Sequence, residues 1–476
     1  MNLRHVADLA IARLGLPIPM AKLATVQAVA RALDSDDTAM AFAEALAGWA
    51  ATRELESQCL EAICPLLVAV PRPEAIALVR RAIGRPSVAS DALLSLVAGA
   101  PTLVAGWTGC HSGPATRFPM LDEEEGQLRA GTFIPPFFTH QFERLESQAR
   151  RPFMRQWAFE YKVLTDRYGG NGDGHLDYFL SSDRENVGQF VAHRSHLARS
   201  AFLRTLACAV EHWGMPEAIA SRIAETAFPA EPIFLRLPPQ NAPEWARIVQ
   251  RRAATEAEDA PTFAKTLIET IEAELNGRLM HCSLAVVDEP NCHIEFEAFA
   301  IAEAKDDLDA MQVIRFYDHL LEKIKPERDA LRAFVSPDLG GKGAAGLGFM
   351  PMLIPLIGYG VGYLQSDLIN RVPYVPVSSI GLPNLELVPM PGGAVFRSDG
   401  RDVGSWGWWR WNWKPTHPRH QPSPIACCAF LTQDAVQQLI KHLGGAMEHV
   451  WRITTWTRDT DYGKWTEAKR TGRYKG

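Results

Sequence analysis

Apolar residues in the first hundred positions recur three and four apart, in six short stretches with breaks between them. One stretch places them at Leu23, Val26, Val29 and Leu33. This spacing puts apolar side chains on one helix face. It predicts amphipathic helices that begin near Asn2, Met20, Asp37, Glu54, Pro73 and Val88. Glycine, proline and aspartate lie between the stretches, which is typical of short turns.

Roughly equal helices joined by short turns resemble the layout of HEAT-type repeats. In such repeats each helix pair buries its apolar face only against its neighbours. The resemblance rests on this layout and on no specific repeat signature. It implies an α-solenoid, or a compact helical array, for residues 1–106.

Later stretches continue the helical pattern and then change to an alternating one. Helices are predicted over residues 141–167, 183–213, 217–227 and 243–277, after a long loop rich in proline and glycine. Alternation then predicts strands at 281–288 and 292–301, joined by a turn at Glu289 and Pro290. Counting back from this turn places Cys282 opposite Glu297 and Val287 opposite Cys292. Helices follow at 307–325 and 432–442.

We therefore expect an α+β protein in three parts. Residues 1–106 form a helical-repeat-like domain, and residues 107–277 form a helical middle region with its proline- and glycine-rich entry loop. Residues 278–476 form a smaller mixed α+β domain that contains a tryptophan-rich segment and a basic tail.

Composition adds a compartment and a charge asymmetry. Apolar residues make up 47% of the chain, which suits a globular protein with a full core. The eight cysteines show no CxxC spacing, which is typical of reduced residues in a cytoplasmic protein. The net charge is −6, yet residues 401–476 hold 12 Lys and Arg against 6 Asp and Glu. This basic C-terminal region suggests an anionic partner, with nucleic acid as one class, or a solvated tail.

Residues 343–366 carry no formal charge and are long enough to cross a bilayer. They support an alternative in which the protein associates with a membrane. Two prolines and six glycines in the segment oppose a spanning helix and favour a buried hairpin or loop.

The stretch YGGNGDGHLDYFL begins at Tyr168 and resembles DxNGDGxxD calcium loops. The resemblance implies cation ligands at Asn171, Asp173 and Asp177. Two ligand positions of such loops fall on Gly169 and Leu180, which have no carboxylate. A capping box from Ser182 to Glu185 supports a second interpretation, in which the stretch is a tight turn that leads into a helix. A divalent cation is therefore the one cofactor for which the sequence offers a candidate site, and no other cofactor is expected.

Glu303 and Lys305 follow the second predicted strand, and Gln312 and Tyr317 lie on the next helix. About 40 residues here resemble the strand and helix of PD-(D/E)xK nucleases, in which carboxylates hold Mg²⁺ and a lysine assists attack on the phosphodiester. The resemblance implies catalytic roles for Glu303 and Lys305. It departs from the pattern at the partner acid, because Asp288 falls at the hairpin tip.

His281, Cys282, Cys292 and His293 are zinc-ligand types at the two ends of the predicted hairpin. At about 3.3 Å per residue, the two pairs lie roughly 17 Å apart along the strands. One Zn²⁺, with bonds of about 2.0 to 2.3 Å, cannot join them. His193 and His196, three apart on a predicted helix, could form half a metal site, although Arg194 and Arg199 favour a solvated or partner-facing surface.

Five tryptophans fall within residues 406–413. In a strand, Trp409, Trp411 and Trp413 share one face, and Arg410 lies on the other. Such residues form either the core of a small domain or an aromatic binding surface, with Lys414 and Arg419 beside it.

The leading expectation is a non-enzymatic interaction or adaptor subunit of a larger cytoplasmic, bacterial-type assembly, with defence or nucleic-acid processing as a setting. A protein is the expected partner. The alternatives are the metal-dependent nuclease and the membrane-associated protein described above.

Overall fold

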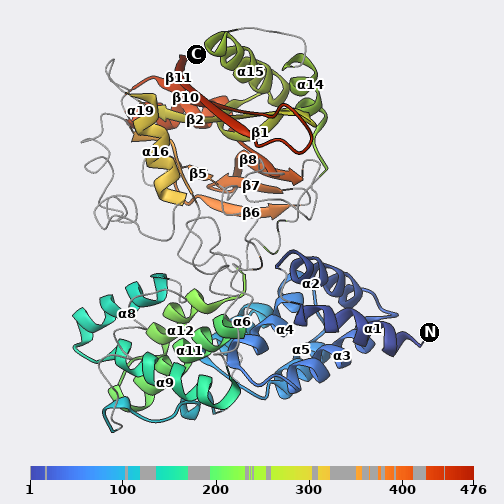
Figure 1. Ribbon diagram of the computed structural model, residues 1–476, viewed down its shortest axis with the longest axis vertical. Helices are drawn as coiled ribbons and strands as arrows, with labels where there is room; N and C mark the ends of the chain where they lie inside the picture. The colour runs from blue at the N-terminus through green and yellow to red at the C-terminus, as the bar shows by residue number, and fades with distance from the viewer. Residues whose placement is uncertain are drawn as a thin grey trace. The chain divides into compact units, whose positions relative to one another are not determined.

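The structure is a computed structural model, and it describes most of the chain in two compact units (Figure 1). Unit 1 comprises residues 1–236 and 358–369, and unit 2 comprises residues 237–357 and 370–476. The described residues are 2–16, 19–101, 106–117, 136–169, 193–230, 235, 237, 241–253, 259–302, 309–321, 350–355, 364, 374–376, 381–390, 393–410, 425–443 and 445–476.

The helices predicted in the first hundred residues are confirmed. They are α1 (Leu3–Ala12), α2 (Pro19–Asp34), α3 (Ala39–Ala51), α4 (Glu56–Val68), α5 (Pro73–Ala82) and α6 (Val88–Ala98). Local signals define their ends. Ser87 and Ser90 form a reciprocal capping box that opens α6, and Gly99 closes it in the left-handed region, at a φ of 63°.

These helices form two layers, because α1, α3 and α5 pack side by side and so do α2, α4 and α6. The α-solenoid is not confirmed. In a solenoid each helix pair contacts its sequence neighbours, whereas α4 here also packs against α11 (His193–Trp213), far along the chain. The other elements in the described part of unit 1 are η1 (Arg13–Gly15), η2 (Trp107–Gly109), η3 (Ala115–Arg117), α8 (Pro136–Ala149), α9 (Phe153–Tyr168), α12 (Glu217–Ala224) and η4 (Glu225–Ala227).

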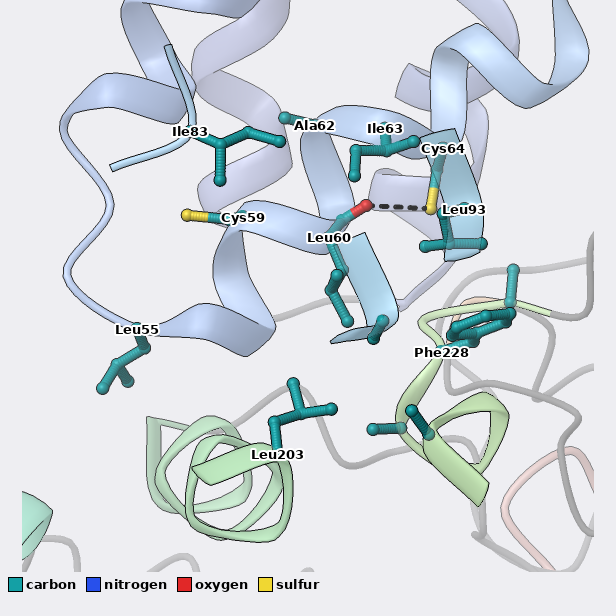
Figure 2. Close-up of a cluster of buried hydrophobic side chains, with 14 of the residues drawn as sticks. Leu55, Cys59, Leu60, Ala62, Ile63, Cys64, Ile83, Leu93, Leu203 and Phe228 are labelled. Atoms are coloured by element: carbon teal, nitrogen blue, oxygen red, sulfur yellow. Dashed lines mark hydrogen bonds between the residues drawn. The ribbon is translucent and has the colours of Figure 1, made fainter. Parts of the chain in front are cut away.

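The core of unit 1 lies where α4 meets α6 and α11. Figure 2 shows Leu60 and Ile63 of α4 beside Leu93 of α6, with Leu203 of α11 in the same cluster. All four are at most 1% exposed. Burial raises the pKa of the Cys59 thiol in this core to about 12, so the thiol stays protonated. α4 is thus a central helix of unit 1.

Unit 2 is built on an antiparallel sheet with the strand order β11-β10-β2-β1-β9-β8-β7-β6, and β3 pairs with the end of β2. The strands are β1 (Arg278–Glu289), β2 (Cys292–Ala302), β3 (Met350–Pro351), β6 (Glu386–Met390), β7 (Gly393–Ser398), β8 (Arg401–Arg410), β9 (Ile425–Leu431), β10 (Met447–Thr457) and β11 (Thr466–Lys475). A separate pair is formed by β4 (Leu353–Pro355) and β5 (Tyr374–Pro376).

Helices lie on both faces of this sheet (Figure 1). α14 (Glu244–Ala253) and α15 (Ala260–Leu275) pack on the face that carries Ala298 and Trp451, which we call face A. α16 (Ala310–Leu321) packs on the opposite face B, where the Tyr317 ring stacks on Phe299 at 4.0 Å. Alternation of side chains along β2 explains why neighbouring residues 298 and 299 serve different faces. α19 (Gln433–Leu443) packs on β8.

Two details of the C-terminal part differ from the sequence expectation. The predicted β1–β2 hairpin is present, but Cys282 pairs with Ala298 instead of Glu297, and Val287 pairs with Ile294 after an irregularity in β1. A shift of one residue reverses which residues share a face. The basic C-terminal region is not only a solvated tail, since its last residues form the edge strand β11.

The predicted domain boundaries at residues 106 and 277 concern independently folding parts and stay predictions.

Candidate functional site

An open pocket of about 290 Å³ lies on face A of unit 2. We call it the Gly407 pocket. Its lining residues come from α14, α15, the ends of β6 and β7, and strands β8 and β9: Pro243, Trp245, Leu275, Met390, Gly393, Ala394, Val395, Ser405, Trp406, Gly407, Trp409, Cys428 and Phe430.

Gly407 makes the floor of this pocket. Ser405, Gly407 and Trp409 occupy every second position along β8, so they point to the same face of the sheet. Gly407 pairs with Cys428 of β9. A glycine between larger residues leaves a gap in the layer of side chains, and this gap is the floor. Its φ is not among the positive values that the described glycines adopt, so a side chain at position 407 fits the backbone.

Aromatic and aliphatic residues make the walls. Trp409 is 2% exposed, and its ring meets Trp245 of α14 in a T-shaped contact at 5.4 Å. Met390 is 45% exposed, so this end of the pocket reaches solvent. Apolar side chains that meet solvent around a hollow are typical of ligand or partner sites.

The pocket contains few polar groups. The Trp409 Nε1 is buried and has no hydrogen-bond partner in the described part of the chain. Burial, with the nearby Cys427 as a smaller cause, raises the pKa of the Cys428 thiol well above its usual range. Cys428 is therefore a protonated wall residue and a poor nucleophile. The pocket is chemically suited to bind an apolar group.

A polar cluster lies on face B. The His281 Nδ1 is 3.7 Å from the Cys427 Sγ, and its Nε2 is 3.9 Å from a Glu297 carboxylate oxygen. Arg452 forms an ion pair with the same carboxylate. Thiol, imidazole and carboxylate stand in the order used in nucleophilic catalysis. Cys427 and His281 are 0% exposed, however, so a substrate cannot reach them in this conformation.

A second buried cluster joins α4 to α11 in unit 1. Ser57 Oγ lies 3.0 Å from His196 Nδ1, and His196 Nε2 lies 3.6 Å from Glu61. The solvated face predicted for this helix is wrong, because Arg194 is 9% and Arg199 4% exposed. Burial lowers the pKa of His196 well below its usual range, so the ring is neutral. The cluster is part of the core.

Several predicted site residues lie outside the described part of the chain. These are Asn171, Asp173 and Asp177 of the calcium-like loop, Glu303 and Lys305 of the nuclease-like motif, and Trp411, Trp413, Lys414 and Arg419 of the aromatic surface. Arg410 ends β8, and its side chain is not described.

The remaining predicted site residues that lie in the described part of the chain are found at different positions in unit 2. Trp409 lies in the wall of the Gly407 pocket. Tyr317 of the nuclease-like motif is 0% exposed and packs as a core residue. Cys282 and Cys292 stay apart, since Cys282 pairs with Ala298 and Cys292 pairs with Glu289. Trp409 was therefore predicted correctly as an aromatic residue of a strand, and the role of Trp409 in binding stays a prediction.

The other wall residues of the pocket could not be predicted from the sequence. Trp245, Leu275 and Phe430 come from separate segments, and nothing in their local pattern links them. The available signal was the glycine inside the aromatic run Trp406-Gly407-Trp408, because a missing side chain between large ones leaves space on a sheet.

Comparisons with known proteins assign no function to the Gly407 pocket or to the two buried clusters. Within the described ranges, no helix combines the length and the apolar character needed to cross a membrane. No protein-family model matches the chain, and none of the curated proteins compared with it shows significant sequence similarity.

Proposed function

We propose that this protein is a non-enzymatic interaction subunit, and that the Gly407 pocket receives an apolar side chain of a protein partner. The observation that carries the proposal is the open, aromatic-walled pocket on face A. Its volume of about 290 Å³ is at the lower end of the range of ligand pockets, roughly 300 to 1,000 Å³. This size suits one aromatic or aliphatic side chain better than a large cofactor.

The chemistry of the lining supports binding over catalysis. Ser405 and Cys428 are the hydroxyl and thiol groups of its described lining, and none of the described lining residues is a histidine or a carboxylate that could act as a base. Tryptophan walls around a hollow that the partner fills and desolvates on binding are typical of the centre of protein interfaces, where a few anchor residues supply most of the binding free energy.

A protein partner fits the charges better than nucleic acid does. The basic residues of β11 are largely paired within the chain. Arg473 and Lys475 both contact Glu448, at 2.5 and 3.0 Å, and Lys469 lies 3.0 Å from Glu467. Paired cations release fewer phosphate counterions, so they contribute less to nucleic-acid affinity. Cytoplasmic location and membership of a larger bacterial-type assembly, in defence or nucleic-acid processing, are parts of this proposal.

The test compares partner capture by the full-length protein and by Gly407→Leu, which fills the pocket floor. Gly109→Leu is the matched control, because nothing lies within 4 Å of a Cβ at that position. Proteins crosslinked in the native host would be quantified by mass spectrometry, with melting temperatures measured beside them. We expect Gly407→Leu to lose a specific partner by about 30-fold, which corresponds to a hot-spot contribution of about 2 kcal/mol. The melting temperature and the control should stay close to wild type.

Equal capture by wild type and Gly407→Leu would refute the role of the pocket. A second test uses a small probe: N-acetyl-phenylalaninamide should quench or shift the fluorescence of the pocket tryptophans in wild type. It should leave the fluorescence of Gly407→Leu unchanged.

A further inference from the structure

Unit 1 carries a group of metal-ligand side chains far from the Gly407 pocket in the sequence. His111 lies between η2 and η3, and Glu211 and His212 lie in the last turn of α11. The ligand atoms of the three side chains all lie within 4.8 Å of one another. His111 Nε2 is 2.8 Å from Glu211 Oε2, and the two imidazole rings meet edge to face at 5.0 Å.

We propose that His111, Glu211 and His212 bind a divalent transition-metal ion, with Zn²⁺ as the best match. Two imidazoles and one carboxylate form a ligand set that zinc accepts with a fourth position left for water. Imidazole also favours the transition metals over Mg²⁺ and Ca²⁺, which prefer oxygen ligands. A bound ion would tie the 106–117 segment to the end of α11.

The segment that carries His111 is held in place by its neighbours, so the ligand is oriented in advance. The Ser112 amide and hydroxyl donate to the Glu160 carboxylate at 2.7 and 2.8 Å. The Gln156 side chain donates to Gly113 O at 2.9 Å and accepts from the Ala115 amide at 2.7 Å. Both Gln156 and Glu160 are 0% exposed. Rigid support of this kind favours metal affinity, because less order is lost on binding.

Access and geometry also suit an ion. The His111 side chain is 6% exposed, whereas that of Glu211 is 42% exposed, so the group has one protected side and one side open to solvent. The carboxylate and the two imidazoles hold their ligand atoms within 4.8 Å of one another, so a cation can meet all three at once.

One hydrogen bond opposes the ion and limits its affinity. The Gly113 amide donates to His111 Nδ1 at 2.9 Å, so in the metal-free protein the proton of this ring is on Nε2. A metal at Nε2 replaces that proton, the neutral ring then carries its proton on Nδ1, and the Gly113 contact must loosen. Losing one such bond weakens binding by roughly tenfold. We therefore expect a site weaker than the closed four-ligand zinc sites.

The test titrates Zn²⁺ alone into the full-length protein, by competition with a chromophoric chelator. It uses wild type, His212→Ala, Glu211→Gln and the control His5→Ala, which removes an exposed histidine from α1. We expect wild type and His5→Ala to bind one more equivalent of Zn²⁺ than His212→Ala, or to bind it at least tenfold more tightly. Glu211→Gln should fall between them. Zn²⁺ should also slow amide hydrogen exchange within residues 106–117 in wild type and leave it unchanged in His212→Ala.

Two results would overturn the proposal. One is equal Zn²⁺ stoichiometry and affinity in wild type and His212→Ala. The other is a loss in His5→Ala as large as the loss in His212→Ala, which would mean nonspecific binding by surface histidines. His212 is exposed, so the variant is expected to fold and a negative result would be informative.

Discussion

The ion pair between Lys22 and Glu61 allows a sharp test of the energetics of unit 1. Lys22 Nζ lies 2.7 Å from both Glu61 carboxylate oxygens and 2.5 Å from Leu14 O. The two side chains are 3% and 2% exposed. Lys22→Met keeps most of the length and the apolar character of the stem but leaves the Glu61 charge buried without the lysine cation. Removing one partner of a buried pair costs about 3 to 5 kcal/mol.

The matched control is Arg4→Met, because Arg4 Nη1 is also 2.7 Å from its partner, Glu44, while these side chains are 40% and 55% exposed. An exposed pair contributes about 0 to 1 kcal/mol, since water solvates both charges when the pair is broken. Both variants replace a basic side chain by methionine at the same ion-pair distance and differ in burial, and Arg4→Met also breaks the exposed pair with Asp8.

The assay is urea unfolding of the full-length protein, followed by the helical signal in far-ultraviolet circular dichroism. We expect Lys22→Met to lower the free energy of unfolding by about 3 to 5 kcal/mol, and Arg4→Met to lower it by less than about 1 kcal/mol. The double variant Lys22→Met/Glu61→Leu should recover most of the loss, because neither charge of this pair remains buried. Equal losses in the two single variants, or no recovery in the double variant, would refute the reasoning.

Three further predictions concern unit 2. Burial lowers the pKa of His449 to about 4, so the folded protein binds fewer protons there than the unfolded chain, whose histidine pKa is about 6.5. Stability should be full above about pH 6.5 and fall by about 3 kcal/mol towards pH 4, and His449→Gln should flatten this part of the profile in urea titrations at stepped pH. Trp409→Ala should cost about 3 to 5 kcal/mol and lower the melting temperature; an unchanged melting temperature would contradict its place in the core. An interaction subunit should not cleave DNA or RNA with Mg²⁺ or Mn²⁺, and cleavage that is lost in both Glu303→Ala and Lys305→Ala would favour the nuclease alternative.

Local signals explain which parts of the fold could be predicted. The helices of the first hundred residues have both apolar periodicity and punctuation, and the start of α6 at Val88 follows its own serine cap. The β1–β2 hairpin was equally local. Its register was wrong, because an irregularity between Ala285 and Val287 adds an offset that strand alternation does not show.

Apart from the tryptophan run at the end of β8, strands β6 to β11 were not predicted. Pairs such as β6–β7 and β10–β11 are formed by consecutive strands, but the pairings of β9 with β1 and of β10 with β2 join segments that are far apart in the chain. β9 pairs with β1, so Cys428 meets Cys282 across the sheet. The Gly407 pocket and the proposed metal group both depend on such meetings: His111 and Glu211 are separated by 100 residues. A pattern within one segment carries no information about which distant segment will lie beside it.

The position of β1 in the middle of the sheet sets an order of events during synthesis. β1 and β2 leave the ribosome together, but the strands that flank them, β9 and β10, follow roughly 120 to 145 residues after β2. At about 5 to 20 residues per second, the hairpin waits on the order of 6 to 30 seconds with both outer edges unpaired. Exposed strand edges template aggregation. The interval between the synthesis of β2 and the synthesis of β9 is therefore the stage at which this protein most needs a chaperone or an early-binding partner.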